Sequence, residues 1–353
     1  MNKPEVPYVK LYRTSFRLSY LLPTMLLLQL LSSSVTAAHD QLTIEARNLG
    51  QLPAVLKESS GLAITGTNRI WTHNDAGNTN EIFCVDTTGT LLRSLFVYNA
   101  LNIDWEDLAM DPQRNIYIND AGNNANDRDD LRIYIIPNPD EVESSFIEAD
   151  IIDFDFPDQN TFPPPQSNRN FDIEALAWWN GYLYLFTKNR SNPQNGYCKL
   201  YRLPALAGTY TATLLDSIYL GNSNASARVT AADINHETGE LVLLTADRIV
   251  SFTNYPHDRF FSGTMTDYYF SEKMGQIEAL VFYTHRKLYM TEEGSSSNPG
   301  YLYDIDLDLI DDLPENSGTG YFRVSPNPSQ GLFRMKTPPP TKVSCNYLPS
   351  KDN

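Results

Sequence analysis

Cysteine is scarce in this sequence, and histidine is both scarce and scattered. Three cysteines in 353 residues (Cys84, Cys198 and Cys345) are too few for a disulfide-stabilised scaffold. Cys84 and Cys198 lie in apolar strand patterns, so we expect them to be buried thiols. No CxxC pair, Cys/His cluster or spaced pair of histidines is present, which argues against a zinc site.

Positive charge is also in short supply. Lys and Arg number 27 against 43 Asp and Glu, giving a net charge of −16. This balance argues against nucleic acid as a partner, because its phosphates are bound through Lys and Arg. The sequence also has no G-x-S-x-G elbow, no P-loop and no dinucleotide fingerprint. An acidic chain of this kind suits an exported protein that binds cations.

Only the N-terminus contains an extended apolar run. Residues 18–31 are mostly apolar, follow the basic residues Lys3, Lys10, Arg13 and Arg17, and precede a small-residue stretch that ends at Ala38. The run is shorter than the roughly 20 residues that span a bilayer. We therefore interpret residues 1–38 as a cleaved signal peptide, with a membrane anchor as the alternative. No other stretch is apolar enough to span a membrane, so no membrane span is expected after cleavage.

A short phrase recurs five times at intervals of 46, 68, 56 and 48 residues. Its occurrences are Ser60-Gly61-Leu62-Ala63, Glu106-Asp107-Leu108-Ala109, Glu174-Ala175-Leu176-Ala177, Thr230-Ala231-Ala232-Asp233 and Glu278-Ala279-Leu280-Val281. A period near 50 with several strands per unit is typical of a β-propeller. The sequence therefore predicts an all-β fold built from repeated blades.

Each repeat can be divided into four strands, except that the last one lacks a fourth. A spare strand precedes the first repeat, at residues 42–48. Pairing this strand with the last blade would remove two free edges. We therefore predict a five-bladed β-propeller over residues 39–312, closed by the N-terminal strand. A six-bladed ring is the alternative.

Every occurrence of the phrase begins with a side chain that carries oxygen. If the blades surround one axis, Ser60, Glu106, Glu174, Thr230 and Glu278 converge on it. Calcium takes 6–8 oxygen ligands, and three glutamates near one axis repel one another without a cation. We therefore predict that these five residues form a central Ca²⁺ site. The alternative is a water-filled channel with a polar lining.

A second set of polar residues follows the second strand of each repeat. Asp75 and Asp120 stand in similar Asn-Asp-Ala-Gly-Asn segments, and Lys188 and Glu292 occupy the aligned positions later in the chain. One interpretation places them around a substrate mouth, with His73 as a base and Arg190 and Arg128 binding an anion. The alternative is ordinary turn chemistry. The catalytic residues are thus unassigned, with candidates His73, Asp75, Asp120, Lys188, Arg190 and Glu292.

The repeats resemble two known groups of proteins. Residues 58–62 and 104–109 are similar to phrases of exported bacterial propellers called SdiA-regulated or esterase-like phytase-type proteins. The series Ser60, Glu106, Glu174, Thr230, Glu278 is similar to that of the calcium-activated nucleotidases, with Thr230 in place of a serine. The second resemblance implies a five-bladed ring with a central calcium. The further substrate-binding motifs of the nucleotidases are not recognised here.

The C-terminal segment has a resemblance of its own. Residues 322–333, which include Ser325-Pro326-Asn327-Pro328, resemble the start of a type IX secretion sorting domain. That domain usually runs longer than the 353-residue chain allows, so residues 313–353 are interpreted as a linker and a truncated sorting remnant. The resemblance implies the type IX secretion machinery as a partner, and a secreted or outer-surface location on a bacterium. A proline-rich linker is the alternative.

Two functions follow from these observations. The first is a calcium-dependent hydrolase of phosphoesters or phosphoanhydrides, in which the metal polarises phosphate and activates water. The second is a non-catalytic binding or surface-interaction propeller with structural calcium or none. The fold can serve either. The sequence does not identify the small-molecule or cell-surface ligand, or the oligomeric state.

Overall fold

A computed structural model describes residues 42–295, 298–311, 325–326 and 333–334. The chain divides into two units, Met1–Asp40 and Gln41–Asn353, and the fold below belongs to the second. The predicted signal peptide lies outside the described residues. So does the predicted tail, apart from the paired strands β23 (Ser325–Pro326) and β24 (Phe333–Arg334). No helix among the described residues is long and apolar enough to cross a membrane.

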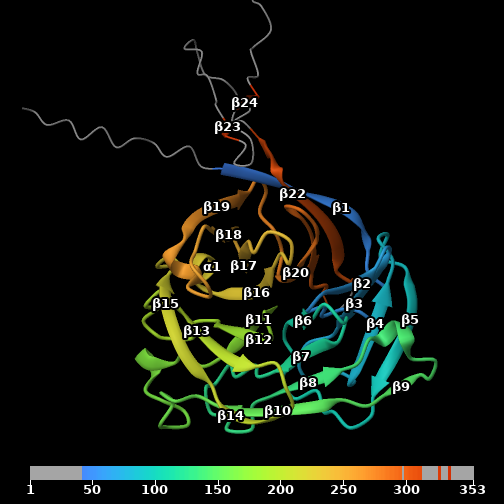
Figure 1. Ribbon diagram of the computed structural model, residues 1–353, viewed down its shortest axis with the longest axis horizontal. Coiled ribbons are helices and arrows are strands. Elements are labelled where there is room, and N and C mark those ends of the chain that lie inside the picture. Colours follow the sequence, from blue (N-terminus) through green and yellow to red (C-terminus); the bar gives the residue numbers. More distant parts are fainter. Residues whose placement is uncertain (1–41, 296–297, 312–324, 327–332, 335–353) are drawn as a thin grey trace, which may run out of the picture. The chain divides into compact units, whose positions relative to one another are not determined.

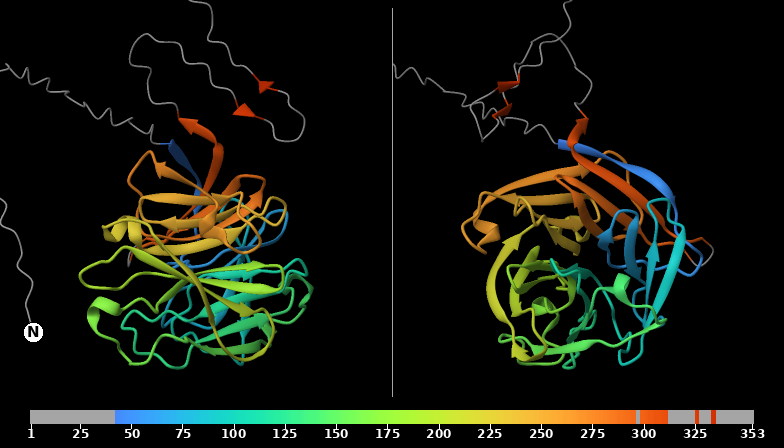
Figure 2. Two further views of the ribbon diagram at one scale, coloured as in Figure 1. Left: turned by 60° about the vertical axis from the view of Figure 1, so that its left-hand side comes forward. Right: turned by 45° about the vertical axis from the view of Figure 1, so that its right-hand side comes forward.

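Most strands fall into antiparallel groups that surround a common centre (Figures 1 and 2). In each group the chain runs from an inner strand outward. The first group contains β2 (Ala63–Gly66), β3 (Arg69–His73), β4 (Glu81–Val85) and β5 (Leu91–Val97). The second contains β6 (Leu108–Met110), β7 (Ile116–Asp120), β8 (Arg132–Ile136) and β10 (Asp150–Asp155).

The later groups repeat this order. The third contains β11 (Ile173–Trp179), β12 (Tyr182–Thr187), β13 (Tyr197–Pro204) and β15 (Thr213–Tyr219). The fourth contains β16 (Val229–Ile234), β17 (Leu241–Thr245), β18 (Arg248–Thr253) and β19 (Thr264–Phe270). The fifth contains β20 (Ile277–Thr284), β21 (Lys287–Glu292), β22 (Tyr301–Asp311) and the N-terminal β1 (Leu42–Gln51).

The predicted closure by the N-terminal strand is confirmed. Strand β1 pairs antiparallel with β22, with Ala46 opposite Ile305 and Arg47 opposite Asp304. It also runs parallel to β19, where Leu42 lies opposite Tyr268. The fourth and fifth groups are therefore joined into one eight-stranded sheet, and β1 lies beside β22 in both views of Figure 2.

Two further strands join neighbouring groups. Strand β9 (Phe146–Ile147) pairs parallel with β5 of the first group, and β14 (Gly208–Thr211) pairs parallel with β10 of the second. Strands β9 and β10 are thus close in sequence but pair with different groups. The connections also contain the short helix α1 (Asn224–Ala227) and the 3-10 helices η1 (Pro139–Glu141), η2 (Gln166–Asn168) and η3 (Phe260–Ser262).

The inner strands close a ring, and the core lies between groups. Each inner strand contacts the next in the order β2, β6, β11, β16 and β20, and β20 contacts β2. Buried apolar side chains form five clusters, each filling the space between two adjacent groups. Trp105 and Tyr134 pack between the first and second groups, and Cys84 and Cys198 are buried free thiols, as predicted. The chain therefore folds as a β-propeller.

Candidate cation site at the propeller axis

The oxygen-bearing residues of the repeated phrase lie at or just before the inner strands, and all are buried. Ser60, Glu106, Glu174, Thr230 and Glu278 are between 1% and 6% exposed. Ser60 Oγ donates a hydrogen bond to Glu106 Oε2 at 3.4 Å. The Thr230 hydroxyl instead donates to the carbonyl of Ile277 at 2.9 Å, so it ties the fourth inner strand to the fifth.

Two basic side chains lie among the glutamates. Lys188 Nζ is 2.9 Å from Glu174 Oε2 and 3.4 Å from Glu278 Oε2. Arg190 Nη2 is 2.6 Å from Glu174 Oε1, and its Nε is 2.5 Å from Asp172. These cations hold the pKa of Glu174 down to about 2, although burial alone would raise it. Glu174 and Glu278 therefore already have positive partners from the chain itself.

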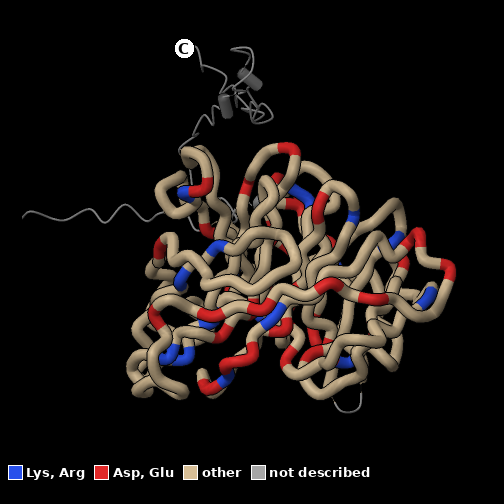
Figure 3. The backbone as a smooth tube through the Cα atoms, turned by 60° about the horizontal axis from the view of Figure 1, so that its bottom comes forward, with Lys and Arg blue, Asp and Glu red and all other residues tan. Residues whose placement is uncertain are grey.

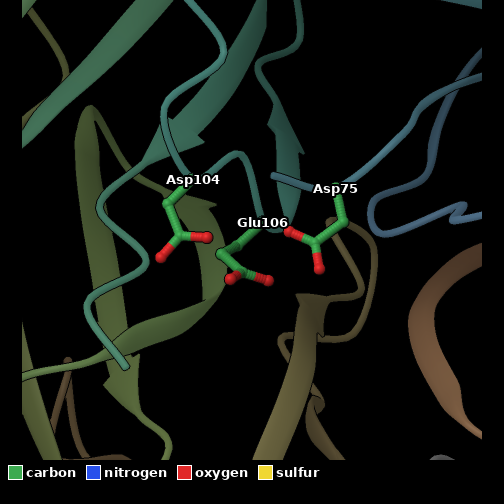
Figure 4. Close-up of side chains that lie close together, drawn as sticks. All are labelled: Asp75, Asp104 and Glu106. Atoms are coloured by element: carbon green, nitrogen blue, oxygen red, sulfur yellow. The ribbon is translucent and has the colours of Figure 1, made fainter. Parts of the chain in front are cut away.

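Glu106 has different neighbours. Ligand oxygens of Asp75, Asp104 and Glu106 all lie within 4.8 Å of one another. Figure 4 shows the three carboxylates pointing toward one another, with Glu106 between the two aspartates. We call these three residues the carboxylate trio. Asp75 and Asp104 are partly exposed while Glu106 is buried, so the trio is open on one side.

The turn after β7 supports the trio. Asp120 accepts a hydrogen bond from the Asp104 amide at 3.0 Å, and Arg128 donates to the Gly122 carbonyl at 2.8 Å. A Cβ on Gly122 would lie 2.5 Å from the Asp104 carboxyl carbon and 2.6 Å from Glu106 Oε1. The absence of a side chain at Gly122 thus makes room for two of the three carboxylates. Asp120 Oδ2 is buried without a hydrogen-bond partner among the described residues.

Burial and mutual repulsion oppose ionisation of the trio. Burial, followed by the charges of Glu174 and Asp75, raises the pKa of Glu106 well above its usual value. Burial raises the pKa of Asp75 to about 7, and burial together with the Glu174 charge raises that of Asp104. A divalent cation would offset this repulsion. The donors are hard carboxylate oxygens, which fit Ca²⁺ or a similar ion.

The remaining catalytic candidates have structural partners. His73 is fully buried, contacts Trp105 edge-on at 5.4 Å and has its pKa lowered to about 4 by burial. Its position in the core does not suit a solvent-facing base. Glu292 accepts a hydrogen bond from Tyr303 at 2.5 Å and lines a separate cavity of about 550 Å³. Asp120 and Arg128 form an ion pair beside the trio.

Several site residues were missed in the sequence. Asp104 and Asp172 stand two positions before Glu106 and Glu174, and Glu58 stands two before Ser60. Side chains two residues apart in an extended segment face the same side. The acidic residues two positions before the repeated phrase could therefore have been predicted to lie near the same site.

Asp107 is a further buried carboxylate, located where the other repeats have Gly61, Ala175, Ala231 and Ala279. Its Oδ2 accepts hydrogen bonds from the amides of Leu176 and Ala232, each at 3.0 Å. One side chain of the second group therefore binds the inner strands of the third and fourth. Asp233 does the same for the fifth, accepting from the Phe282 amide at 2.8 Å.

Comparison with known proteins gives distant likenesses. No protein-family model and no curated protein matches the chain. Among solved structures, it is similar to a PQQ-bound aldose sugar dehydrogenase from Streptomyces coelicolor. The identity is 11%, the match covers 75% of this chain and 98% of that one, and the TM-score is 0.47.

Two other solved structures show likenesses that are equally distant. A putative oxidoreductase (glucose dehydrogenase) from Thermus thermophilus is 10% identical, with 74% and 99% coverage and a TM-score of 0.42. A gluconolactonase from Xanthomonas campestris is 12% identical, with 70% and 71% coverage and a TM-score of 0.37. Similarities this distant assign no activity to the chain.

Proposed function

We propose that this chain is an exported, five-bladed β-propeller that binds a divalent cation, calcium by its ligand chemistry, at the carboxylate trio. The observation that carries the proposal is the convergence of Asp75, Asp104 and Glu106 within 4.8 Å on the open side of the inner strands. The blade count rests on the closed series of contacts between inner strands, with β1 completing the last blade.

The proposed site differs in composition from the five-residue set expected from the sequence. Glu106 belongs to both, and Ser60 reaches Glu106 through its hydroxyl. Lys188 and Arg190 neutralise Glu174, and Lys188 neutralises Glu278. The trio provides three carboxylates, and water would complete the 6–8 ligands that calcium takes.

Calcium titration with a matched control tests this proposal. Isothermal titration calorimetry of the purified full chain should show calcium binding that Asp104→Asn weakens about tenfold or more, because one anionic ligand is lost. Glu237→Gln, at an exposed glutamate that is not in the trio, should bind like the unmodified protein. Equal affinity in all three proteins, or no heat of binding at millimolar calcium, would contradict the proposal.

Calcium-dependent hydrolysis of phosphoesters or phosphoanhydrides is a second candidate. It is favoured by the partial exposure of Asp75 and Asp104, since metal-assisted hydrolysis requires a coordination position open to water and substrate. Against it, Lys188 and Arg190 are already paired with carboxylates and are not free to bind phosphate. Assays against nucleotides, phytate and simple esters, with calcium and with chelator, decide between binding and catalysis.

Export is the remaining part of the proposal. It rests on the signal-like residues 1–38 and on the sorting-like phrase at residues 322–333. Expression of the full chain in a bacterium with type IX secretion should place it in the medium or on the outer surface. Retention in the cytoplasm of that host would contradict export, and retention in the periplasm would show that the sorting-like phrase does not direct passage across the outer membrane.

A further inference from the structure

We propose that a cavity of about 600 Å³ beside the third blade binds a neutral carbohydrate. The cavity is bordered by the connection between β10 and β11 and by residues of β13 and β15. No residue of the carboxylate trio lines it. Its volume is within the roughly 300–1,000 Å³ of small-molecule sites.

Ion-pair, hydrogen-bond and ring contacts in the wall of this cavity hold the loop between β10 and β11 in place. Lys199 Nζ forms an ion pair with Asp158 at 2.6 Å and lies 3.8 Å from the centre of the Phe171 ring. Tyr201 donates a second hydrogen bond to Asp158 at 2.8 Å. Because both charges of the wall are paired with each other, the cavity provides neither a free cation nor a free anion among its described lining residues. This favours a neutral ligand over a phosphate or a carboxylate.

The lining nevertheless has many uncharged hydrogen-bonding groups. The hydroxyls of Thr161 and Ser217 form no hydrogen bond within the described part of the chain, and Asn170 Oδ1 is buried there without a partner. The amides of Asn168 and Asn195 also line the cavity. Amides and hydroxyls provide donors and acceptors together, which is what a ligand rich in hydroxyl groups requires. A purely apolar ligand would leave these groups unpaired, at a cost.

An aromatic surface stands beside these polar groups. Tyr197, also in the lining, is 46% exposed, and its ring is held by an edge contact with Tyr219 at 5.5 Å. A tyrosine ring has an apolar face and a polar hydroxyl. A pyranose ring is complementary, with an apolar C–H face and hydroxyl groups at its edge. Removing the Tyr197 side chain should not disturb the loop through hydrogen bonds, because the loop residue Asn170 bonds to the Tyr197 main-chain carbonyl.

Calorimetric titration of the full chain tests the inference. The probes are maltohexaose, cellohexaose, mannohexaose and chitohexaose, with hexagalacturonate as an anionic comparison. We expect at least one neutral probe to bind in the millimolar range or tighter, equally in calcium and in chelator. Tyr197→Ala should weaken this binding about tenfold or more, because the stacking surface is lost. Ser217→Tyr, which fills the cavity from an exposed position on β15, should abolish it.

The control is Tyr98→Ala, which removes a tyrosine of similar exposure (51%) from outside the cavity and should bind like the unmodified protein. Absence of binding to all probes, binding of hexagalacturonate alone, or unchanged binding by both cavity variants would overturn the inference. Loss of saccharide binding in chelator would also overturn it, because the ligand would then belong to the cation site. Since calcium binding is measured separately, either proposal can fail without the other.

Discussion

At the scale of single residues, the glutamates of the repeated phrase are not equivalent. Glu174 and Glu278 contact Lys188, whereas Glu106 joins Asp75 and Asp104. The period of the repeats predicted that these oxygens come from inner strands. It could not predict which of them the basic residues would neutralise, because Lys188 and Arg190 reach the axis from the end of the neighbouring strand and the following turn.

We predict that Lys188→Met destabilises the protein by about 3–5 kcal/mol, because it leaves Glu174 and Glu278 buried without their partner. Lys287→Met is the matched control. Lys287 is half-exposed and pairs with Asp306 at 2.9 Å, so its replacement should destabilise the protein far less than that of Lys188. Urea denaturation in chelator measures both. Equal effects of the two changes would show that Lys188 is not the main partner of the axial glutamates.

Asp107 is the second residue whose role depends on its surroundings. Asp107→Ala should cost about 2–6 kcal/mol, because the amides of Leu176 and Ala232 each lose a partner, at about 1–3 kcal/mol per buried group. Alanine itself fits, since three other repeats have it at this position. Chemical denaturation gives the value. A loss below about 0.5 kcal/mol would mean that water replaces the carboxylate.

At the scale of secondary-structure elements, outer strands join neighbouring blades. Strands β9 and β14 pair with the blade before their own, and β1 pairs with both β19 and β22. The sequence predicted the closing strand because a fourth strand was missing from the last repeat. It did not predict β9 and β14, since a two- to four-residue parallel pairing leaves no periodic pattern along the chain.

The closing strand provides a prediction at this scale. Ile44 is fully buried between β19 and β22, and Ile44→Ala should destabilise the protein by about 2–5 kcal/mol. Glu45→Ala, at the adjacent exposed position, should change stability by less than about 0.5 kcal/mol. Thermal melting of both variants compares them. If Ile44→Ala melts at the same temperature as the unmodified protein, β1 does not hold the ring closed.

At the scale of the whole molecule, acidic side chains outnumber basic ones, and the two kinds lie interspersed along the backbone (Figure 3). The described fold buries several of these carboxyls. Burial raises the pKa of Asp75, Asp172, Asp233 and Glu278 to about 7, and that of Glu293 to about 8. The folded protein therefore keeps protons that the unfolded chain releases at lower pH.

This difference predicts how stability depends on pH without calcium. Where the folded state binds more protons than the unfolded state, the free energy of unfolding falls as pH rises. Burial lowers the pKa of His73 and His236. These two histidines make the free energy of unfolding rise with pH, but only below about pH 6.5. In chelator, the urea concentration at the unfolding midpoint should therefore decrease as the pH rises from about 6.5 to about 8. Saturating calcium should flatten this fall, because the cation replaces protons at the trio. A midpoint that rises with pH over this range would contradict the raised pKa values of the buried carboxyls.

The proposed function depends on the binding of one cation to Asp75, Asp104 and Glu106. The most direct test is anomalous X-ray diffraction from crystals of the protein soaked in terbium, which takes the oxygen ligands of calcium. We expect a strong anomalous peak about 2.3–2.6 Å from carboxylate oxygens of the trio, absent from Glu106→Gln crystals treated in the same way. A peak bound by Glu174 and Glu278 with Lys188 displaced, or no peak at the axis, would contradict it.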